Sequence, residues 1–194
     1  MRKIVLVGGG GHCKACIDVI ESTGMYEISG IVDSRLVLDG IDYPRLCSDE
    51  ELPKYLNRNS SFFVTVGQIK ESSVRQRLFK QLKSFEANLP IIKSPFAYIS
   101  GRCEIESGTI IMHQALVNAR SRIGENCIIN SQSLIEHDVV VESNCHISTG
   151  AKLNGGVYVG ANSFIGSGAI IREGVYIMPG SIVAAGQVIL ADYP

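Results

Sequence analysis

A histidine directly before a carboxylate is the clearest catalytic signal in the sequence. His137 precedes Asp138 in the stretch Ile135-Glu136-His137-Asp138. A carboxylate beside an imidazole fixes its tautomer and raises its basicity, so that the ring can take a proton from an attacking nucleophile. We therefore predict that His137 is a general base and that Asp138 orients it. An exposed histidine with no role beyond solvation is the simpler alternative for such a position.

A run of four glycines, residues 8–11, is the second chemical signal. It lies between an apolar stretch and an expected helix, where backbone N–H groups can approach a phosphate at the positive helix N-terminus. His12 follows the run, and Asp33 comes at the end of the next expected strand, where a carboxylate can bind a sugar or base hydroxyl. The third glycine of a dinucleotide fingerprint is replaced by Cys13, so a site for one nucleotide or nucleotide-sugar is favoured over dinucleotide redox chemistry. A tight turn without a ligand is the alternative.

The six cysteines give no metal or redox pattern. Cys13 and Cys16 have CxxC spacing, but no second pair completes a zinc site, and the context differs from that of a thioredoxin. Cys127 and Cys145 are eighteen residues apart and are interpreted as buried packing residues. We predict no metal cofactor.

A repeat of six residues supplies the framework for the histidines. Stepping by six through residues 99–189 meets only Ile, Val or Leu, sixteen times in succession. The residue four places after each of these is nearly always small. This period fits neither a helix nor an ordinary strand, but it is typical of hexapeptide repeats in a parallel β-helix. Each unit forms one side of a triangular prism, so about eighteen residues make one coil, stacked at about 4.8 Å. A sandwich of two sheets would need turn clusters every 8–12 residues, and the sequence lacks them.

The prism places three histidines on its outside. His113, His137 and His146 lie two or five places after an inward residue. His146 follows His137 by nine residues, which is half a coil. The two cannot share one small metal site unless a neighbouring subunit brings them together.

The first ninety residues lack the hexapeptide register and alternate strands with helices. Strands are expected over 3–7, 28–32, 62–66 and 89–92, and helices over 14–22, 50–56 and 70–83. This alternation predicts βαβ units around a parallel sheet. We expect an α/β domain with a parallel sheet at residues 1–93 and an all-β parallel β-helix at residues 94–194.

Charge and hydropathy exclude several partners. The net charge of −1 over 194 residues gives no electrostatic case for nucleic acid. No apolar run approaches the eighteen residues that a membrane span needs, and the apolar stretch near the N-terminus is too short for a signal peptide. A reducing compartment and a cytoplasmic location are expected.

Taken together, these motifs resemble a known family. The glycine run with His12 after the first strand, Val66-Gly67 ahead of Arg75, and His137-Asp138 in a hexapeptide prism are similar to the sialic acid O-acetyltransferase / bacillosamine N-acetyltransferase family. The resemblance covers essentially the whole chain. It implies a left-handed β-helix homotrimer that binds acetyl-CoA along the prism between subunits. It also implies that the N-terminal domain is a small Rossmann-like domain that holds a sugar nucleotide.

The resemblance also implies roles for particular residues of the prism. His137 matches the catalytic base, Asp138 the acidic residue that polarises it, and Asn130 an active-site asparagine one turn earlier. His146 matches a histidine near the acetyl-CoA thioester, and Ser167 and Ala185 fall where the chain meets the pantetheine and beyond. Family members commonly end in a Gly-Val-Pro-Ala-Lys tail against the CoA, where this sequence has residues 191–194.

In the N-terminal part, the resemblance implies substrate contacts. The residues concerned are Gly10, Gly11, His12, Asp33 and Gly67. The family usually has a second acidic residue directly after the position of Asp33, where this sequence has serine, so the nucleotide itself stays open.

We therefore predict an acetyl-CoA-dependent enzyme that N-acetylates a nucleotide-linked amino sugar in bacterial surface-glycan biosynthesis. Direct attack on the thioester needs neither a metal nor a protein nucleophile. The alternative within enzymes is O-acetylation of a sialic-acid-type sugar. The alternative of another class is a non-catalytic β-helix subunit for binding or assembly, against which the pairing of His137 with Asp138 argues.

Overall fold

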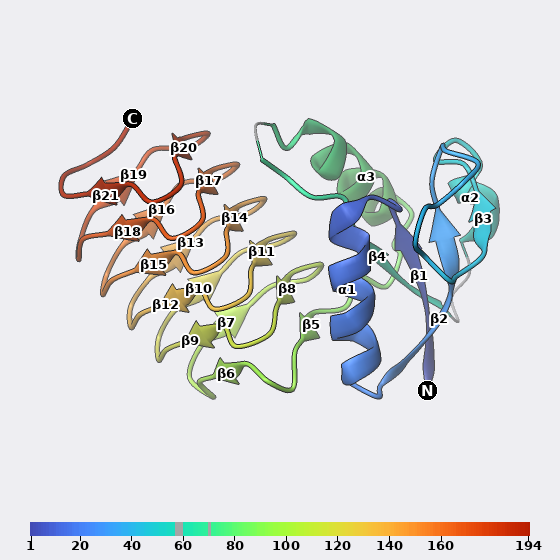
Figure 1. Cartoon of the computed structure of the whole chain (residues 1–194), viewed down its shortest axis with the longest axis horizontal. Coiled ribbons are helices and arrows are strands. Elements are labelled where there is room, and N and C mark those ends of the chain that lie inside the picture. The colour runs from blue at the N-terminus through green and yellow to red at the C-terminus, as the bar shows by residue number, and fades with distance from the viewer. Residues whose placement is uncertain (57–59, 70) are drawn as a thin grey trace. The chain divides into compact units, whose positions relative to one another are not determined.

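The computed structural model describes residues 1–56, 60–69 and 71–194, and the chain divides into two compact units (Figure 1). Unit 1 consists of Met1–Gly67 and Ser73–Pro90, and unit 2 of Gln68–Ser72 and Ile91–Pro194. The segment Gln68–Ser72 therefore belongs with unit 2, although it lies between two parts of unit 1 in the sequence.

Unit 1 is built on a sheet of four parallel strands in the order β3-β2-β1-β4. The strands are β1 (Arg2–Val7), β2 (Tyr26–Val32), β3 (Arg45–Cys47) and β4 (Ser60–Val64). The helices are α1 (Gly11–Ser22), α2 (Leu52–Tyr55) and α3 (Ser73–Ser84). The predicted alternation of strands and helices is thus present, with a parallel sheet at its centre.

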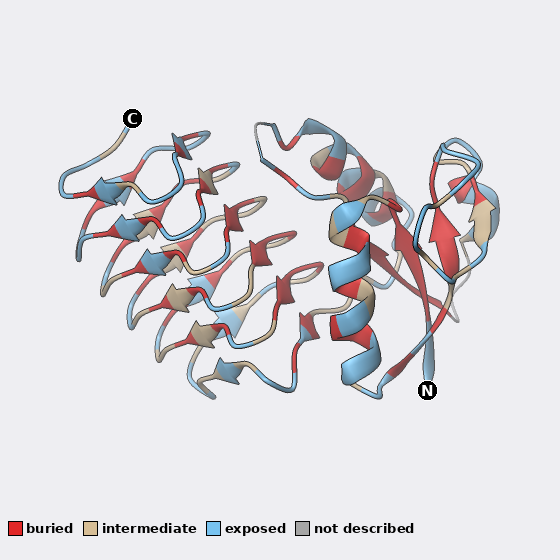
Figure 2. Ribbon diagram, in the orientation of Figure 1, coloured by how far each residue is buried: buried red, intermediate tan, exposed pale blue. Residues whose placement is uncertain are grey.

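Apolar side chains explain why these segments form this sheet. The last four residues of β1 and all five of β4 are buried, as a parallel sheet covered on both faces requires (Figure 2). Helix α3 adds Leu78, Phe79 and Leu82 to the same core. Valine, isoleucine and phenylalanine suit a pleated, buried surface, so local preference and burial agree here.

Three details of unit 1 differ from the sequence prediction. Strand β3 was not expected, because its three residues are too few to show a period. The strand expected over 89–92 is instead β5 (Ile92–Lys93), which pairs in unit 2. Helix α3 begins at Ser73, and residue 70, where the helix was expected to begin, lies outside the described residues.

Unit 2 is a parallel β-helix, in which the stacked coils form three parallel sheets, one on each side of the prism (Figure 1). We name them sheet B, with six strands from β5 to β20, sheet C, with six from β6 to β21, and sheet D, with five from β7 to β19. Each strand has two residues and pairs with the strand eighteen residues away. The strands of sheet B are β5 (Ile92–Lys93), β8 (Ile110–Ile111), β11 (Ile128–Ile129), β14 (His146–Ile147), β17 (Phe164–Ile165) and β20 (Ile182–Val183).

The other two sheets repeat this pattern. Sheet C contains β6 (Tyr98–Ile99), β9 (Leu116–Val117), β12 (Leu134–Ile135), β15 (Lys152–Leu153), β18 (Ile170–Ile171) and β21 (Val188–Ile189). Sheet D contains β7 (Glu104–Ile105), β10 (Arg122–Ile123), β13 (Val140–Val141), β16 (Tyr158–Val159) and β19 (Tyr176–Ile177). The prism begins one strand earlier than the apolar series indicated, because the polar Lys93 stands in β5 where the later strands have an aliphatic residue.

The inward register forms the core of the prism. From Ile111 onward the second residue of every strand is buried, and together with the small residues in the second register these side chains make one continuous cluster. Cys127 and Cys145 are both buried in it, and the backbone N–H of Cys145 lies 3.4 Å from the sulfur of Cys127. The eighteen-residue stacking predicted for this cysteine pair is confirmed.

The corners of the prism depend on left-handed backbone. From Gly108 to Gly186, every sixth residue has a φ between 56° and 78°. Glycine accepts this conformation without strain, and asparagine and aspartate tolerate it better than other residues do. Arg120 and Asp138 are two of the residues that occupy this position. The corners therefore share one backbone conformation, and consecutive coils present equivalent side chains there.

The two faces of β20 allow a matched stability test. Val183 points inward and is fully buried, whereas Ile182 points outward and is 49% exposed. Val183→Ala is expected to lower the free energy of unfolding by about 2 kcal/mol, from lost burial and the cavity left behind. Ile182→Ala removes more atoms but is expected to cost only about 0.5 kcal/mol. Chemical denaturation of both variants measures the difference, and an equal or larger loss in Ile182→Ala would contradict the inward register.

Candidate active site

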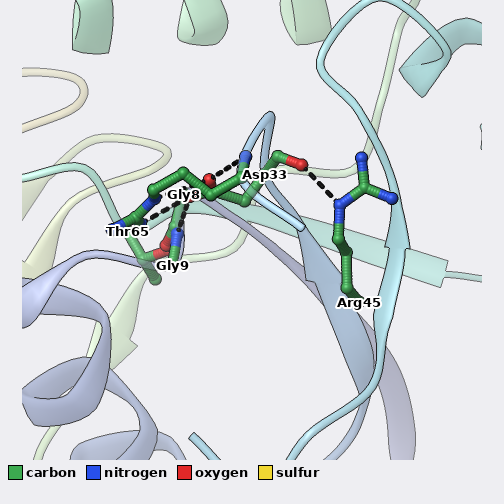
Figure 3. A network of polar contacts seen from close by, with 6 residues as sticks. Gly8, Gly9, Asp33, Arg45 and Thr65 are labelled. Atoms are coloured by element: carbon green, nitrogen blue, oxygen red, sulfur yellow. Dashed lines mark hydrogen bonds and ion pairs between the residues drawn. The ribbon is translucent and has the colours of Figure 1, made fainter. Parts of the chain in front are cut away.

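The glycine run forms a turn between β1 and α1 that is held from two sides. The N–H of Gly8 donates to the carbonyl of Val32, and the hydroxyl of Thr65 donates to the carbonyl of Gly8 (Figure 3). Gly8 has a φ of 106°, and a Cβ there would lie 2.4 Å from a methyl group of Val66. A side chain at this position is therefore excluded by both backbone and space. Around Gly10 and Gly11 no atom would touch an added Cβ within 4 Å, so the turn is open there.

Asp33 fastens this turn to the end of β2. Its Oδ2 accepts from the N–H of Gly9 at 2.6 Å and from Nη2 of Arg35 at 2.8 Å. Its Oδ1 accepts from the N–H and the Nε of Arg35, at 2.8 and 2.9 Å. The guanidinium of Arg35, with the N–H of Gly9, holds the pKa of this carboxyl at about 2 despite its burial. The carboxylate is therefore ionised and occupied by protein donors, and Arg45 also donates to the backbone carbonyl of Asp33 (Figure 3).

His12 and Gly67 lie together beside the turn. Gly67 packs against the side chain of His12, since a Cβ at Gly67 would lie 3.3 Å from its Cβ. The buried Arg75 of α3 donates to the carbonyls of Val64 and Val66, at 2.8 and 2.9 Å, and so fixes the segment that leads to Gly67. Unit 1 thus gathers Gly10, Gly11, His12, Asp33 and Gly67 around one turn.

The CxxC cysteines in α1 have an environment that disfavours reactivity. Both thiols are buried, and burial raises the pKa of Cys13 and of Cys16. A reactive cysteine needs a lowered pKa.

Among residues 1–56, 60–69 and 71–194, no three His, Cys, Asp or Glu side chains are arranged to hold a metal ion. No helix in the same part of the chain is long and apolar enough to cross a membrane.

His137 and Asp138 form a hydrogen-bonded pair at the corner between sheets C and D. Nδ1 of His137 lies 2.9 Å from Oδ2 of Asp138. The hydrogen bond from His137, followed by the charge of Arg120, lowers the pKa of the Asp138 carboxyl. An ionised carboxylate can only accept, so Nδ1 of His137 carries the proton and Nε2 keeps its lone pair. The imidazole is 65% exposed, so Nε2 can meet a reactant from solvent.

Gly155 shapes the surface under this imidazole. It lies at the same corner, one coil after His137, and a Cβ there would come within 2.7 Å of Cε1 and 2.8 Å of Nε2 of the ring. The backbone bond from Gly156 N–H to the carbonyl of His137 keeps the two coils in register. The position of the ring therefore requires glycine at residue 155. The sequence has twenty glycines, and nothing in it alone distinguishes Gly155 from the others.

Asn130 and His146 form a second polar group, on sheet B and its corner with sheet C. Nδ2 of Asn130 lies 3.1 Å from Nε2 of His146, and Nδ1 of His146 lies 2.6 Å from the carbonyl of Gln68. The carbonyl can only accept, so Nδ1 donates to it and Nε2 accepts from Asn130. His146 points away from the prism core, as predicted, but it is only 6% exposed, and Phe164 packs edge-on against its ring.

Ser167 and Ala185 extend this group along the same corner. They are eighteen residues apart in the corner that follows β17 and β20, and both are exposed. The hydroxyl of Ser167 lies 2.9 Å from that of Ser148, one coil earlier. We call the set Asn130, His146, Ser148, Ser167 and Ala185 the corner strip.

The prism thus separates its predicted residues into two places. Asn130 lies with His146 in the corner strip, whereas His137 and Asp138 lie at the other edge of sheet C. Four contacts of the site residues were not expected from the sequence, and they involve Arg35, Gln68, Arg120 and Gly155. Arg120 had a usable signal, because it precedes Asp138 by one coil of eighteen residues.

Three family models match parts of the chain. One described as the PglD N-terminal domain matches residues 3–82. One described as bacterial transferase hexapeptide (six repeats) matches residues 120–155, and one described as hexapeptide repeat of succinyl-transferase matches residues 156–191. A comparison with curated proteins found no match.

Solved structures resemble the chain over its whole length. The acetyltransferase domain of PglB from Neisseria gonorrhoeae FA1090, in complex with acetyl coenzyme A, has a TM-score of 0.92 and 29% identity, covering 100% of this chain and 93% of that one. A variant of perosamine N-acetyltransferase from Caulobacter crescentus, in complex with CoA and GDP-perosamine, has a TM-score of 0.91 and 31% identity, with coverage of 100% and 91%. WeeI from Acinetobacter baumannii AYE, at 19% identity, a TM-score of 0.76 and coverage of 97% and 96%, shares the fold.

The packing of His137 over Gly155 is open to a direct test. Gly155→Ala is expected to push the imidazole aside and lengthen its bond to Asp138 from 2.9 Å to beyond hydrogen-bonding distance, about 3.5 Å. Gly101→Ala is the matched control, because Gly101 lies at the same corner, two coils before His137, and an added Cβ there meets no atom within 4 Å. Crystal structures of both variants measure the distance, and an unmoved ring in Gly155→Ala would show that this contact does not position His137.

Proposed function

The chain belongs to the bacillosamine-type N-acetyltransferase family, in which a PglD N-terminal domain precedes hexapeptide repeats, and on this premise we propose that it transfers the acetyl group of acetyl-CoA to the amine of a nucleotide-linked amino sugar. The observation that carries the proposal is the pair His137–Asp138, in which Nδ1 is engaged and Nε2 faces outward. The same family membership supports a left-handed prism, a Rossmann-like unit 1 and a role in bacterial surface-glycan synthesis in the cytoplasm.

The proton transfer follows from the tautomer of His137. The amine nitrogen attacks the thioester carbon, the N–C bond forms, and the C–S bond breaks with release of the CoA thiolate. Nε2 of His137 takes the proton that the amine loses and can return it to the thiolate. Asp138 stabilises the imidazolium through Nδ1–H. General-base catalysis of this kind contributes roughly 10²–10⁴ in rate.

The corner strip has the donors that an extended thioester substrate needs. The hydroxyls of Ser148 and Ser167 lie on successive coils, and Ala185 continues the line. His146 has no N–H to spare while Gln68 accepts from its Nδ1. Asn130 keeps a second amide hydrogen, so Asn130 is the side chain that can donate to the developing oxyanion. In this arrangement His146 orients Asn130.

Substrate binding is assigned to the turn in unit 1. Gly10 and Gly11 offer open backbone at the start of α1, and His12 and Gly67 lie beside them. A helix N-terminus with exposed backbone N–H groups is suited to phosphate. Asp33 shapes this turn through Gly9, and Arg35 would have to leave its carboxylate before a sugar or base hydroxyl could bind there.

A homotrimer would complete the site. The pair His137–Asp138 and the corner strip lie at opposite edges of sheet C, so one chain does not bring them together. The outward face of sheet C also exposes apolar side chains, with Tyr98 at 61%, Ile170 at 37% and Val188 at 55%. A second copy of this chain, placed against that face, would cover these side chains and join one corner to the other.

The acceptor decides between the candidate functions. We expect a higher kcat/KM for a nucleotide-linked amino sugar than for the same free amino sugar, because the remote nucleotide contributes binding energy that positions the amine. Thiol release from acetyl-CoA is measured with matched linked and free sugars and with a sialic acid. His137→Ala is expected to lower kcat by roughly 10²–10⁴. A preference for the sialic acid hydroxyl would replace N-acetylation by O-acetylation, and an absence of turnover with every acceptor would favour a binding subunit.

Assembly is tested on the apolar face. The double variant Ile170→Glu with Val188→Glu is expected to dissociate the trimer and abolish turnover, since it buries two charges without partners. Ile182→Glu, on the outward face of sheet B, is the control and should leave the trimer intact. Light scattering gives the mass of each. A wild-type monomer with full activity would contradict the shared site.

A further inference from the structure

The carboxylate of Asp138 is shared between two partners. Oδ2 accepts from Nδ1 of His137 at 2.9 Å, and Oδ1 lies 2.7 Å from Nε of Arg120. Each oxygen therefore has its own donor. The two contacts together leave the carboxylate little freedom to rotate, although it is 44% exposed.

The repeat itself places Arg120 beside Asp138. The two residues occupy the same left-handed corner position on adjacent coils, with φ values of 64° and 61°. The N–H of Asp138 donates to the carbonyl of Ala119 at 3.2 Å, which keeps the coils in register at this point. Arg102 precedes Arg120 by one coil but lacks the left-handed backbone, and Gly156, which has no side chain, follows Asp138 by one coil. Arg120 is thus the charged neighbour of Asp138 in this column.

Other charged groups near the pair have different contacts. Arg102, Arg122 and Glu104 line the same hollow of about 310 Å³ as Arg120 and Asp138. Within the described residues, neither Arg102 nor Arg122 makes an ion pair with Asp138. Glu136, next to His137 in the chain, accepts from Asn118 and from the N–H of His137. The side chain of Arg120 is therefore the one whose loss would release the carboxylate.

We propose that Arg120 is a positioning residue of the proposed reaction: by holding Oδ1 it keeps the Asp138 carboxylate in the orientation in which Oδ2 accepts Nδ1–H of His137. The inference rests on the proposed function, because it acts through the general base. Arg120 need not touch either substrate. Loss of Arg120 is therefore expected to lower kcat and to leave the binding of acetyl-CoA and of the acceptor nearly unchanged.

The test is a double-mutant cycle on the full-length protein with acetyl-CoA and the best acceptor. Arg120→Ala is expected to lower kcat about threefold to tenfold, a size typical of an exposed ion pair and of coupled neighbours, with both KM values within about twofold. In the Asp138→Ala background, Arg120→Ala is expected to change kcat less than about twofold, because its target is gone. Arg120→Lys should restore part of the loss, since an ammonium can still donate to Oδ1.

Arg102→Ala is the matched control from the same column, and its kcat should stay within about twofold of wild type. Arg120 is 79% exposed, so folding is expected to survive, and thermal melts of all variants check this. Equal losses with and without Asp138 would overturn the proposal, as would a loss confined to the acceptor KM, which would make Arg120 a phosphate contact. A wild-type chain without turnover would remove the proposed function and this inference with it, whereas normal turnover in Arg120→Ala would remove the inference alone.

Discussion

The structure of unit 2 depends on one constraint, the filling of a narrow prism by one aliphatic and one small side chain in every six residues. Each inward aliphatic residue packs on the one eighteen residues away, and parallel backbone hydrogen bonds hold the coils in register. Burial of these side chains supplies the stabilisation, and their uniform size keeps the coils parallel. A stack this regular gives every corner residue a predictable neighbour on the next coil.

The regular spacing of the coils determines which side chains of the candidate site contact one another. His137 lies over Gly155 because the two occupy equivalent positions one coil apart, and Arg120 meets Asp138 for the same reason. Asn130 lies in the corner after β11, and His146 lies on β14 of the next coil. Their side chains therefore meet between adjacent coils. The site residues therefore rest on short rigid corners rather than on long loops, which suits a reaction that needs a base held in one orientation.

Unit 1 holds its candidate residues through hydrogen bonds at the ends of its strands. Its sheet brings the ends of β1, β2 and β4 to one place, and hydrogen bonds from Gly8, Gly9 and Thr65 draw the glycine turn against them. Asp33 and Arg35 form an ion pair at this point between a buried and an exposed side chain, with exposures of 9% and 57%. The four protein donors on the carboxylate of Asp33 hold the turn in its shape. A ligand could bind this carboxylate only by displacing one of these donors.

The sequence by itself determined the stacked prism, the parallel α/β unit, and the pairing of His137 with Asp138. The first two follow from periods that repeat along the chain, and the third from direct adjacency. Tertiary structure decided which distant groups meet: Asn130 bonds to His146 and not to His137, and the N–H of Gly9 donates to the carboxylate of Asp33. It also decided that Gln68 covers His146, because the segment Gln68–Ser72 leaves unit 1 and joins unit 2. Contacts of this kind depend on how coils and strand ends are brought side by side, and no local pattern of residue types records that.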